Sequence, residues 1–263
     1  MIDAHCHLEQ SEFDADLDKM IEDCKAAGIK ALVTCCAHPK DFEKSLRILE
    51  RFQGYVFLCA GLHPEFISEI KESEKDEYLE RIKNENEKIS AIGEIGLDYF
   101  WCPEKDKQAA QRELFAEMLE FAHELRKPVV IHIRGARGFP DEAFSDAFKI
   151  LEDAGNHALL HLFGARRFVQ RALENDFYIS IGPSIATSKD VKKIARDFPL
   201  EKIALETDSP WFGGKDKEGR ALRGTPLNIK IAAAEIAQIK KLSFDDVWAA
   251  CGRNAAEFFK LKI

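Results

Sequence analysis

The sequence of 263 residues lacks the long apolar segments of membrane proteins. No run approaches the roughly 18 consecutive apolar residues that a transmembrane helix needs. Its first residues also lack the basic stretch followed by an apolar segment that is typical of a signal peptide. We therefore expect a cytoplasmic protein without a membrane partner, acting either as an enzyme or as a binding protein.

Cysteine is present, but without the spacing of a cross-linked or zinc-binding framework. The seven Cys residues are odd in number, and no two of them form a Cys-x-x-Cys pair. They lie mostly in apolar or helical stretches, where a free Cys behaves as a small hydrophobic residue. We expect reduced thiols in a reducing compartment and no disulfide framework.

An excess of positive charge is also missing. The chain has 38 Lys and Arg residues against 46 Asp and Glu residues, which gives a formal net charge of −8. This balance excludes a strongly basic surface for nucleic-acid binding. Any bound polyanion would have to be held by a local positive feature, such as a metal ion.

The sequence does contain a regular alternation of short apolar runs and longer amphipathic segments. Such an alternation indicates parallel strands joined by right-handed helical crossovers. The expected strands lie within residues 1–8, 29–37, 55–65, 89–99, 128–134, 157–164, 177–184 and 202–211. The expected helices cover residues 13–27, a segment from about 41, and residues 73–88, 106–126, 141–154, 165–175, 189–197 and 227–259.

Eight such units in a chain of this length predict an α/β fold, a distorted (β/α)₈ TIM barrel. We expect residues 1–263 to form a single domain, since barrels of this kind commonly run near about 250 residues. A doubly wound open sheet is the alternative. The longest irregular stretch, residues 209–226, is rich in Gly, Lys and Arg, and long loops are often functional.

Polar side chains recur at the carboxyl ends of these apolar runs. In a barrel all of those ends lie on one face, where active sites of this architecture are built. Residues two apart in a strand point to the same side, so His5 and His7 present two imidazoles together. The other polar residues at these ends are His63, Glu94, His132, His161 and Asp208. We interpret three further histidines as ordinary structural or surface residues, namely His38, His123 and His157.

Four of the histidines and two carboxylates exceed the ligands that one zinc ion takes. They suit two divalent ions bridged by Glu94, whose charge would otherwise be buried at high cost in the apolar segment AIGEIG. We expect His5, His7 and Asp208 at one ion, and His132 and His161 at the other. Two such ions can clamp the attacking and leaving oxygens of a phosphoester, which predicts hydrolysis. Asp208 could also take the proton of the nucleophilic water. Histidine and carboxylate ligands suit Zn, Mn, Ni and, less well, Mg, so the metal identity stays open.

Six segments combine these polar residues with apolar runs, namely IDAHCHL, GLHPE, AIGEIGLDYF, PVVIHIR, LLHLFG and LETDSPW. In order and spacing they resemble the signature segments of the TatD family of metal-dependent deoxyribonucleases, members of the amidohydrolase-like barrel superfamily. The resemblance runs from Met1 to about Pro226 and continues into RNAAEFF near the carboxyl terminus.

The resemblance implies a TIM barrel, two divalent cations and phosphodiester hydrolysis, often as DNA nuclease activity. By position, the family's metal ligands correspond to His5, His7, Glu94, His132, His161 and Asp208. His63 and Arg134 look like residues that approach the substrate phosphate in that family. An Arg beside a metal site can also bind phosphate in a bidentate way, although a structural salt bridge is the alternative for Arg134.

The sequence departs from the family pattern in three loops. The segment from His161 to Gly164 is one residue shorter than usual, Gly135 replaces an acidic residue, and Arg-Gly-Thr-Pro at residues 223–226 replaces Arg-Asn-Glu-Pro. All three departures lie in loops that we expect to face the substrate, and none of them removes an expected ligand. They leave the metal chemistry better supported than the substrate.

The leading hypothesis is a metal-dependent phosphodiesterase that acts on DNA. The acidic net charge argues against tight binding to duplex, so single strands or 3′ ends are the expected substrates. One alternative keeps the barrel and the metals but acts on a small ester or amide, as an amidohydrolase or lactonase. Relatives of that kind often bridge their metals with a carboxylated lysine, where this chain offers Glu94. Another alternative is a non-catalytic metal-binding protein. We expect a monomer, with a weak homodimer as the alternative.

Overall fold

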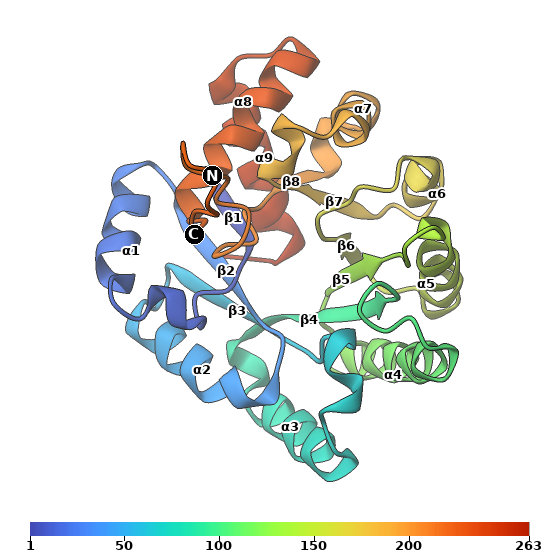
Figure 1. Cartoon of the computed structure of the whole chain (residues 1–263). Helices are drawn as coiled ribbons and strands as arrows, with labels where there is room; N and C mark the ends of the chain where they lie inside the picture. The colour runs from blue at the N-terminus through green and yellow to red at the C-terminus, as the bar shows by residue number, and fades with distance from the viewer. Residues whose placement is uncertain (263) are drawn as a thin grey trace.

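The computed structural model describes residues 1–262 and arranges eight parallel strands in one sheet that curls around a central axis (Figure 1). The strands follow one another in chain order, so neighbours in the sequence are hydrogen-bonded neighbours in the sheet. They are β1 (Ile2–Cys6), β2 (Ala31–Cys36), β3 (Val56–Ala60), β4 (Ile89–Asp98), β5 (Val129–Arg134), β6 (Ala158–Leu160), β7 (Tyr178–Ile181) and β8 (Ile203–Leu205). This order confirms the predicted barrel and is not that of a doubly wound sheet, in which the strand order reverses at a switch point.

The barrel closes between β8 and β1 through residues that follow β8. Asp208 N donates to the carbonyl of His5 at 2.9 Å, and His7 N donates to the carbonyl of Ser209 at 2.8 Å. The fully buried Asp3 carboxylate accepts hydrogen bonds from Thr207 N at 3.0 Å and from Thr207 Oγ1 at 2.6 Å. The first and last strands are therefore joined at the point where three of the expected site residues lie.

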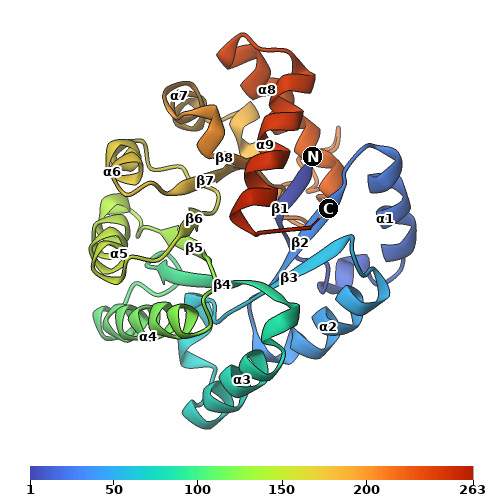
Figure 2. The same cartoon turned by 180° about the vertical axis from the view of Figure 1, so that it is seen from behind.

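Helices cover the outside of the barrel, as both views along its axis show (Figure 1, Figure 2). They are α1 (Leu17–Ala26), α2 (Phe42–Arg51), α3 (Glu72–Asn84), α4 (Lys105–Glu124), α5 (Pro140–Ala154), α6 (Val169–Glu174), α7 (Lys189–Asp197), α8 (Ile229–Lys240) and α9 (Phe244–Phe258). Helix α5 illustrates the packing, because its buried residues Ala143, Ala147 and Leu151 recur at the helical spacing of four residues. None of the helices within residues 1–262 has the length and apolarity to cross a membrane.

Most helices lie within a few residues of their predicted bounds, and α7 has the predicted bounds. The helix expected over residues 13–27 begins only at Leu17, because residues 11–13 form a 3₁₀ turn that buries Phe13. The segment expected as one helix over residues 165–175 is divided into a 3₁₀ turn and the short α6. The carboxyl-terminal segment forms two helices, since Lys241 adopts a left-handed conformation with φ 57° between them.

Small and branched apolar residues together fill the barrel interior, among them Ala4, Cys35, Ala91, Val130 and Leu159. All seven Cys residues lie within the described part of the chain and are buried as free thiols. In a barrel of eight strands the interior is just wide enough for such side chains to fill it, so no channel remains. The interior is therefore a packed core and not a pore.

Helix α9 closes the amino-terminal end of the barrel, which Figure 2 shows from that side. Its Ala255 and Phe258, together with Phe259, pack with the interior residues in one cluster. His157 lies at this end, with its ring 4.8 Å from Phe258 and 5.4 Å from Tyr178. This position agrees with the interpretation of His157 as an ordinary residue. The opposite, carboxyl end of the strands is the end left open for a site.

Candidate metal centre

The predicted ligands come together at the carboxyl ends of the strands. His5 lies in β1, Glu94 in β4 and His132 in β5, while His7 and His161 follow β1 and β6 directly. Asp208 lies three residues beyond the end of β8. A cavity of about 740 Å³ opens at this end, and its lining includes His7, His63, Glu94, His132, Arg134, His161 and Asp208. The structure therefore brings all of these predicted residues to one place.

One group of four ligand atoms surrounds a point between β1, β4 and the end of β8. His5 Nε2 lies 3.1 Å from His7 Nε2, 3.4 Å from Glu94 Oε2 and 3.6 Å from Asp208 Oδ1. His7 Nε2 lies 3.3 Å from the same Asp208 oxygen and 3.8 Å from the same Glu94 oxygen. Four atoms bound at about 2.0–2.1 Å to a tetrahedral zinc ion would lie roughly 3.3–3.4 Å apart. The spacing of this group fits one cation.

The second group gathers around the other oxygen of Glu94. Glu94 Oε1 lies 2.8 Å from His132 Nδ1 and 3.2 Å from His161 Nε2. His63 Nε2 is 3.5 Å from the same oxygen. One oxygen of Glu94 thus faces each group, as expected for a carboxylate that bridges two cations.

Irregularities in two strands aim these ligands into the barrel mouth. The pairing of β4 with β5 shifts register between Ile92 and Ile95, where Glu94 lies. The pairing of β1 with β2 shifts between Asp3 and Cys6, where His5 lies. Bulges of this kind bend a strand locally and redirect a side chain, and they are common beside active sites.

Buried carboxylates outside the ligand set orient three of the histidines. Glu9 Oε1 lies 3.1 Å from His7 Nδ1, Glu206 Oε2 lies 3.0 Å from His161 Nδ1, and Asp98 Oδ2 lies 2.9 Å from His132 Nε2. A carboxylate holds the N–H of a neutral imidazole and leaves the lone pair of the other nitrogen for a metal. These contacts turn His7 Nε2, His161 Nε2 and His132 Nδ1 toward the two groups.

Glu9, Asp98 and Glu206 were not among the site residues predicted from the sequence. Each of them carries a detectable signal, because it lies two or four residues from a predicted ligand at the carboxyl end of an apolar run. Glu206 and Asp98 are fully buried and Glu9 is nearly so. A buried carboxylate is paired or neutralised, so its position beside a metal-ligand candidate is informative.

The ionisation of the site indicates a shortage of positive charge. Burial lowers the pKa of His132, but hydrogen bonds with Asp98 and Glu94 outweigh burial and raise that pKa to about 9. Burial also lowers the pKa of His161, but the charges of Glu206 and Glu94 raise it well above 6.5. The imidazoles of His132 and His161 thus hold protons that balance the carboxylates, whereas burial lowers the pKa of His5. Because a metal needs neutral imidazole, divalent cations would take the place of these protons, and the donor set fits them.

His63 differs from the three histidines that carboxylates orient, because its remote ring nitrogen accepts a hydrogen bond and has no carboxylate within hydrogen-bond distance that would hold a proton there. Its Nδ1 accepts a hydrogen bond from Glu65 N at 3.2 Å, in the cap of the 3₁₀ helix Pro64–Ser68. A neutral His63 therefore carries its proton on Nε2, the atom that faces Glu94. This makes it a hydrogen-bond donor toward the cavity and not a lone-pair ligand.

Arg134 lies at the end of β5 and lines the cavity. Its guanidinium is 4.1 Å from the centre of the Phe100 ring, a cation–π contact that leaves the planar fork accessible for an anion. The side chain thus contacts an aromatic ring where a structural salt bridge would place a carboxylate. This arrangement favours the substrate-facing interpretation of Arg134.

The model of the family described as TatD related DNase matches residues 2–260. The chain belongs to this family. Human deoxyribonuclease TATDN3 is 34% identical to it, across 98% of this chain and 94% of that protein. The metal-dependent hydrolase YabD of Bacillus subtilis is 27% identical, across 99% of each chain. This TatD family member is therefore a metal-dependent hydrolase, and the resemblance inferred from its motifs is confirmed.

Solved structures agree with the fold of this TatD family member. A TatD family hydrolase from Entamoeba histolytica superimposes with a TM-score of 0.85 at 20% identity and covers 100% of this chain and 98% of its own. YjjV, a TatD homologue from Escherichia coli, gives a TM-score of 0.85 at 23% identity, with the same coverage. At these identities the similarity concerns the barrel, and the chemistry depends on the residues described above.

Proposed function

We propose that this TatD family hydrolase cleaves phosphodiester bonds of DNA, using two divalent cations held by His5, His7, Glu94, His132, His161 and Asp208. The observation that carries the proposal is Glu94, which turns one oxygen to each of two groups of ligand atoms. Such cations, when bound, polarise a phosphoryl oxygen and lower the pKa of a coordinated water. The proposal treats residues 1–263 as one catalytic unit.

The protein's own residues have distinct roles in this reaction. Asp208 lies at the rim of the first group, where its carboxylate can accept the proton of the attacking water. His63 can donate its Nε2 proton to an oxygen of the phosphate, because its Nδ1 is held by Glu65 N. Arg134 can pair with another phosphate oxygen from the cavity wall.

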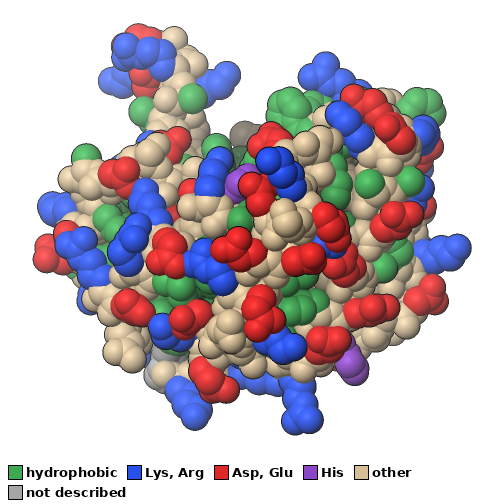
Figure 3. Space-filling model, turned by 90° about the horizontal axis from the view of Figure 1, so that it is seen from below, with side chains coloured by type: hydrophobic (Ala, Val, Ile, Leu, Met, Phe, Trp, Pro, Cys, Tyr) green, Lys and Arg blue, Asp and Glu red, His purple; other side chains and the backbone are tan. Residues whose placement is uncertain are grey.

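We propose single strands or 3′ ends as the substrate. The net charge of −8 gives little general attraction for duplex DNA. On the flank drawn in Figure 3, acidic and basic side chains are intermixed and form no large patch of one sign. Binding would then depend on the local cationic groups at the barrel mouth. The named activity of human deoxyribonuclease TATDN3 supports DNA as the polymer.

We also propose that the enzyme is a cytoplasmic monomer. The buried free thiols support a reducing compartment, because none of them is paired in the described chain. Light scattering after size-exclusion chromatography measures the molar mass in solution. A mass near 29.8 kDa is expected, and one near twice that value would contradict the monomer.

Replacing Glu94 tests the bridging role. We expect Glu94→Gln and Glu94→Ala to lower bound metal and to reduce hydrolysis of single-stranded DNA by about 100-fold or more, because both ligand groups lose an anionic oxygen. Elemental analysis and gel assays with Mg²⁺, Mn²⁺ and Zn²⁺ measure the two effects. Glu69→Gln, at an exposed position, is the matched control. Full metal content and activity in the Glu94 variants would contradict the role.

A substrate panel separates the proposed nuclease from its alternatives. Single-stranded DNA, duplex DNA, RNA, a chromogenic phosphodiester and chromogenic esters and amides are each incubated with the metal-loaded protein. Turnover of the esters or amides alone would indicate an amidohydrolase or lactonase. Metal binding without turnover of any substrate would indicate a metal-binding protein.

A further inference from the structure

Three large aromatic rings are exposed around the cavity of the candidate metal centre. Trp101 is 56% exposed, Trp211 is 48% exposed and Phe212 is 47% exposed, and all three line that cavity. Large apolar side chains exposed around one cavity often mark a binding site in soluble proteins. The metal-centre roles described above do not account for these rings.

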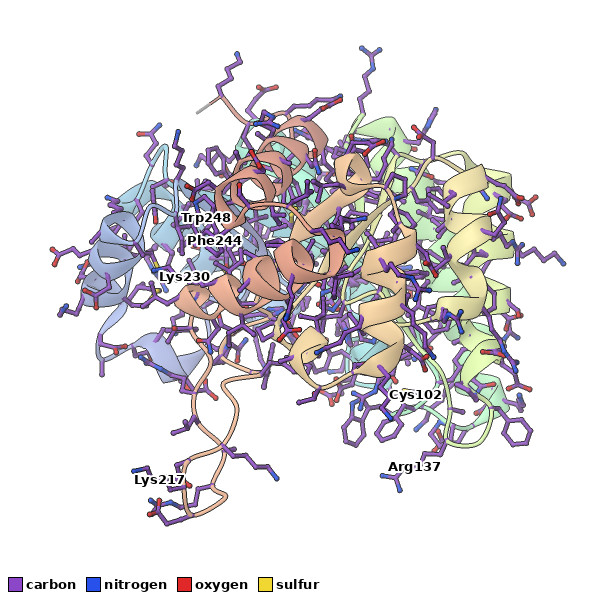
Figure 4. The ribbon with its side chains drawn as sticks, turned by 90° about the horizontal axis from the view of Figure 1, so that it is seen from above. Cys102, Arg137, Lys217, Lys230, Phe244 and Trp248 are labelled. Atoms are coloured by element: carbon purple, nitrogen blue, oxygen red, sulfur yellow. The ribbon has the colours of Figure 1, made fainter. Side chains whose placement is uncertain are left out.

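The rings stand on opposite walls of the barrel mouth. Trp101 follows β4, whereas Phe212 follows β8, and these strands are four positions apart in the order of eight. In Figure 4, Cys102, the neighbour of Trp101, lies on one side of this face. The loop that carries Lys217 projects from the other side, at the bottom of the same view. A ligand that reaches the metal centre would pass between the two walls.

The side chain of Asp98 fixes the turn that carries Trp101. Asp98 Oδ1 accepts hydrogen bonds from Phe100 N and from Trp101 N, each at 2.9 Å. The other oxygen of Asp98 contacts His132, so the Trp101 turn and the metal centre share one buried carboxylate. The position of Trp101 is therefore coupled to the position of a metal-ligand candidate.

On the opposite wall, the segment that carries Phe212 lies at the base of a hairpin formed by residues 213–224, and contacts at this base fix its position. Gly224 N donates to the carbonyl of Pro210 at 2.7 Å, and a Cβ at Gly224 would lie 1.9 Å from the Trp211 carbonyl oxygen. Arg223 forms two hydrogen bonds with Asp16, at 2.7 and 2.6 Å. The departure from the family pattern at Gly224 thus allows the close approach that fixes this wall.

Two arginine side chains lie near the aromatic rings that follow β4. The guanidinium of Arg134 is 5.5 Å from the Trp101 ring and 4.1 Å from the Phe100 ring, and that of Arg137 is 5.0 Å from the Phe100 ring. Arg137 points away from the molecule at the same end (Figure 4). Exposed aromatic faces beside arginines along a groove are typical of proteins that bind single-stranded nucleic acid. In a duplex the bases stack on one another and cannot offer their faces.

We propose that Trp101 and Phe212 each stack on an unpaired nucleobase of single-stranded DNA, on the two sides of the phosphate at the metal centre. The inference rests on the proposed function, because it takes the polymer from that proposal. It adds the residues that select an unpaired strand. Trp211 is left out of the test, because the centre of its ring lies 4.7 Å from that of His7 in a T-shaped contact. Replacing it would also disturb a metal-ligand candidate.

The test compares Trp101→Ala and Phe212→Ala with the wild-type enzyme on two matched oligonucleotides. One is an intact single strand, and the other carries abasic residues at the two nucleotides joined by the scissile phosphate. Each variant should raise KM for the intact strand by about fivefold or more and leave KM for the abasic strand unchanged, since each stacked base contributes roughly 1–3 kcal/mol. Trp101→Phe, which keeps an aromatic face, should restore most of the lost affinity.

Phe244→Ala is the matched control, because Phe244 is 38% exposed on α9, away from the barrel mouth (Figure 4). It should leave KM unchanged for both strands. Equal KM changes on the intact and abasic strands, or no change on either, would overturn the stacking inference while the nuclease activity stands.

Fluorescence anisotropy of both labelled oligonucleotides separates this inference from the proposed function. Base-dependent binding that is lost in Trp101→Ala and Phe212→Ala supports stacking even if the wild type hydrolyses no DNA, an outcome that would end only the proposed function. Equal binding of intact and abasic strands by the wild type would overturn the stacking inference.

Discussion

Glu206 shows how one buried carboxylate supports the site at the scale of single residues. One of its oxygens lies 3.0 Å from His161 Nδ1, and the other accepts from Leu162 N at 2.6 Å. Leu162 adopts a left-handed conformation with φ 45°, which costs energy for a residue other than Gly. Glu206 therefore holds both the ring of His161 and the strained turn that follows it.

We predict that Glu206→Gln weakens metal binding by about 10- to 100-fold, because Gln has one acceptor oxygen and cannot serve both donors. A titration of the apoprotein with Zn²⁺ or Mn²⁺ measures the affinity, and kcat/KM on single-stranded DNA should fall with it. Glu201→Gln, at an exposed position, is the control and should change neither quantity. Unchanged metal affinity in Glu206→Gln would contradict the orienting role.

The same residues show which parts of the site a sequence can predict. His5 and His7 were predictable because the period of a strand places both rings on one side, and Glu94 because a carboxylate in an apolar run needs a partner. The pairing of Glu206 with His161 was not predictable, since these residues are 45 positions apart and meet through β6 and β8. The direction of each imidazole depends on such pairings.

At the scale of elements, the bulge in β4 has a specific chemical requirement. Gly96 has φ 138°, and a Cβ there would lie 2.0 Å from the His132 carbonyl oxygen. Only Gly therefore allows β4 to approach β5 where Glu94 and His132 face each other.

We predict that Gly96→Ala destabilises the protein by about 2–5 kcal/mol, from backbone strain together with overpacking. It should also reduce the metal content. Gly138→Ala is the matched control, because Gly138 has φ 81° but a Cβ added there would meet nothing within 4 Å. Gly138→Ala should lower the free energy of unfolding by only about 1 kcal/mol and leave the metal content unchanged. Urea unfolding and elemental analysis measure both variants, and equal losses would show that β4 does not require Gly96.

Helix and strand identity followed from periodicity, whereas several boundaries did not. The expected helix over residues 13–27 begins late because burial of Phe13 favours a 3₁₀ turn, a tertiary effect that local pattern does not contain. The expected carboxyl-terminal helical segment divides at Lys241, whose left-handed conformation has no marker such as Gly or Pro. The register shifts in β1 and β4 depend on how each strand pairs with its neighbour, so they could not be predicted from the sequence either.

At the scale of the whole molecule, the eightfold alternation predicted the barrel, but not how its first and last strands meet. The closure depends on side chains as well as on backbone. Asp3 and Thr207 are 204 positions apart, and the carboxylate of Asp3 accepts from both the N–H and the hydroxyl of Thr207. Since His7 and Asp208 lie beside this contact, the barrel closes at the point where the first group of ligand atoms is assembled.

This closure gives a stability prediction for the complete chain. Thr207→Val should lower the free energy of unfolding by about 1–3 kcal/mol, because the fully buried Asp3 carboxylate loses a hydroxyl donor at 2.6 Å and has no access to water. Thr187→Val makes the same chemical change at an exposed position and should shift stability by less than about 0.5 kcal/mol. Urea unfolding with an unchanged m-value measures both. Equal midpoints for the two variants would mean that the Thr207 hydroxyl adds nothing to the closure, which would then depend on the hydrogen bond from Thr207 N to Asp3 and on the backbone hydrogen bonds of His5 and His7.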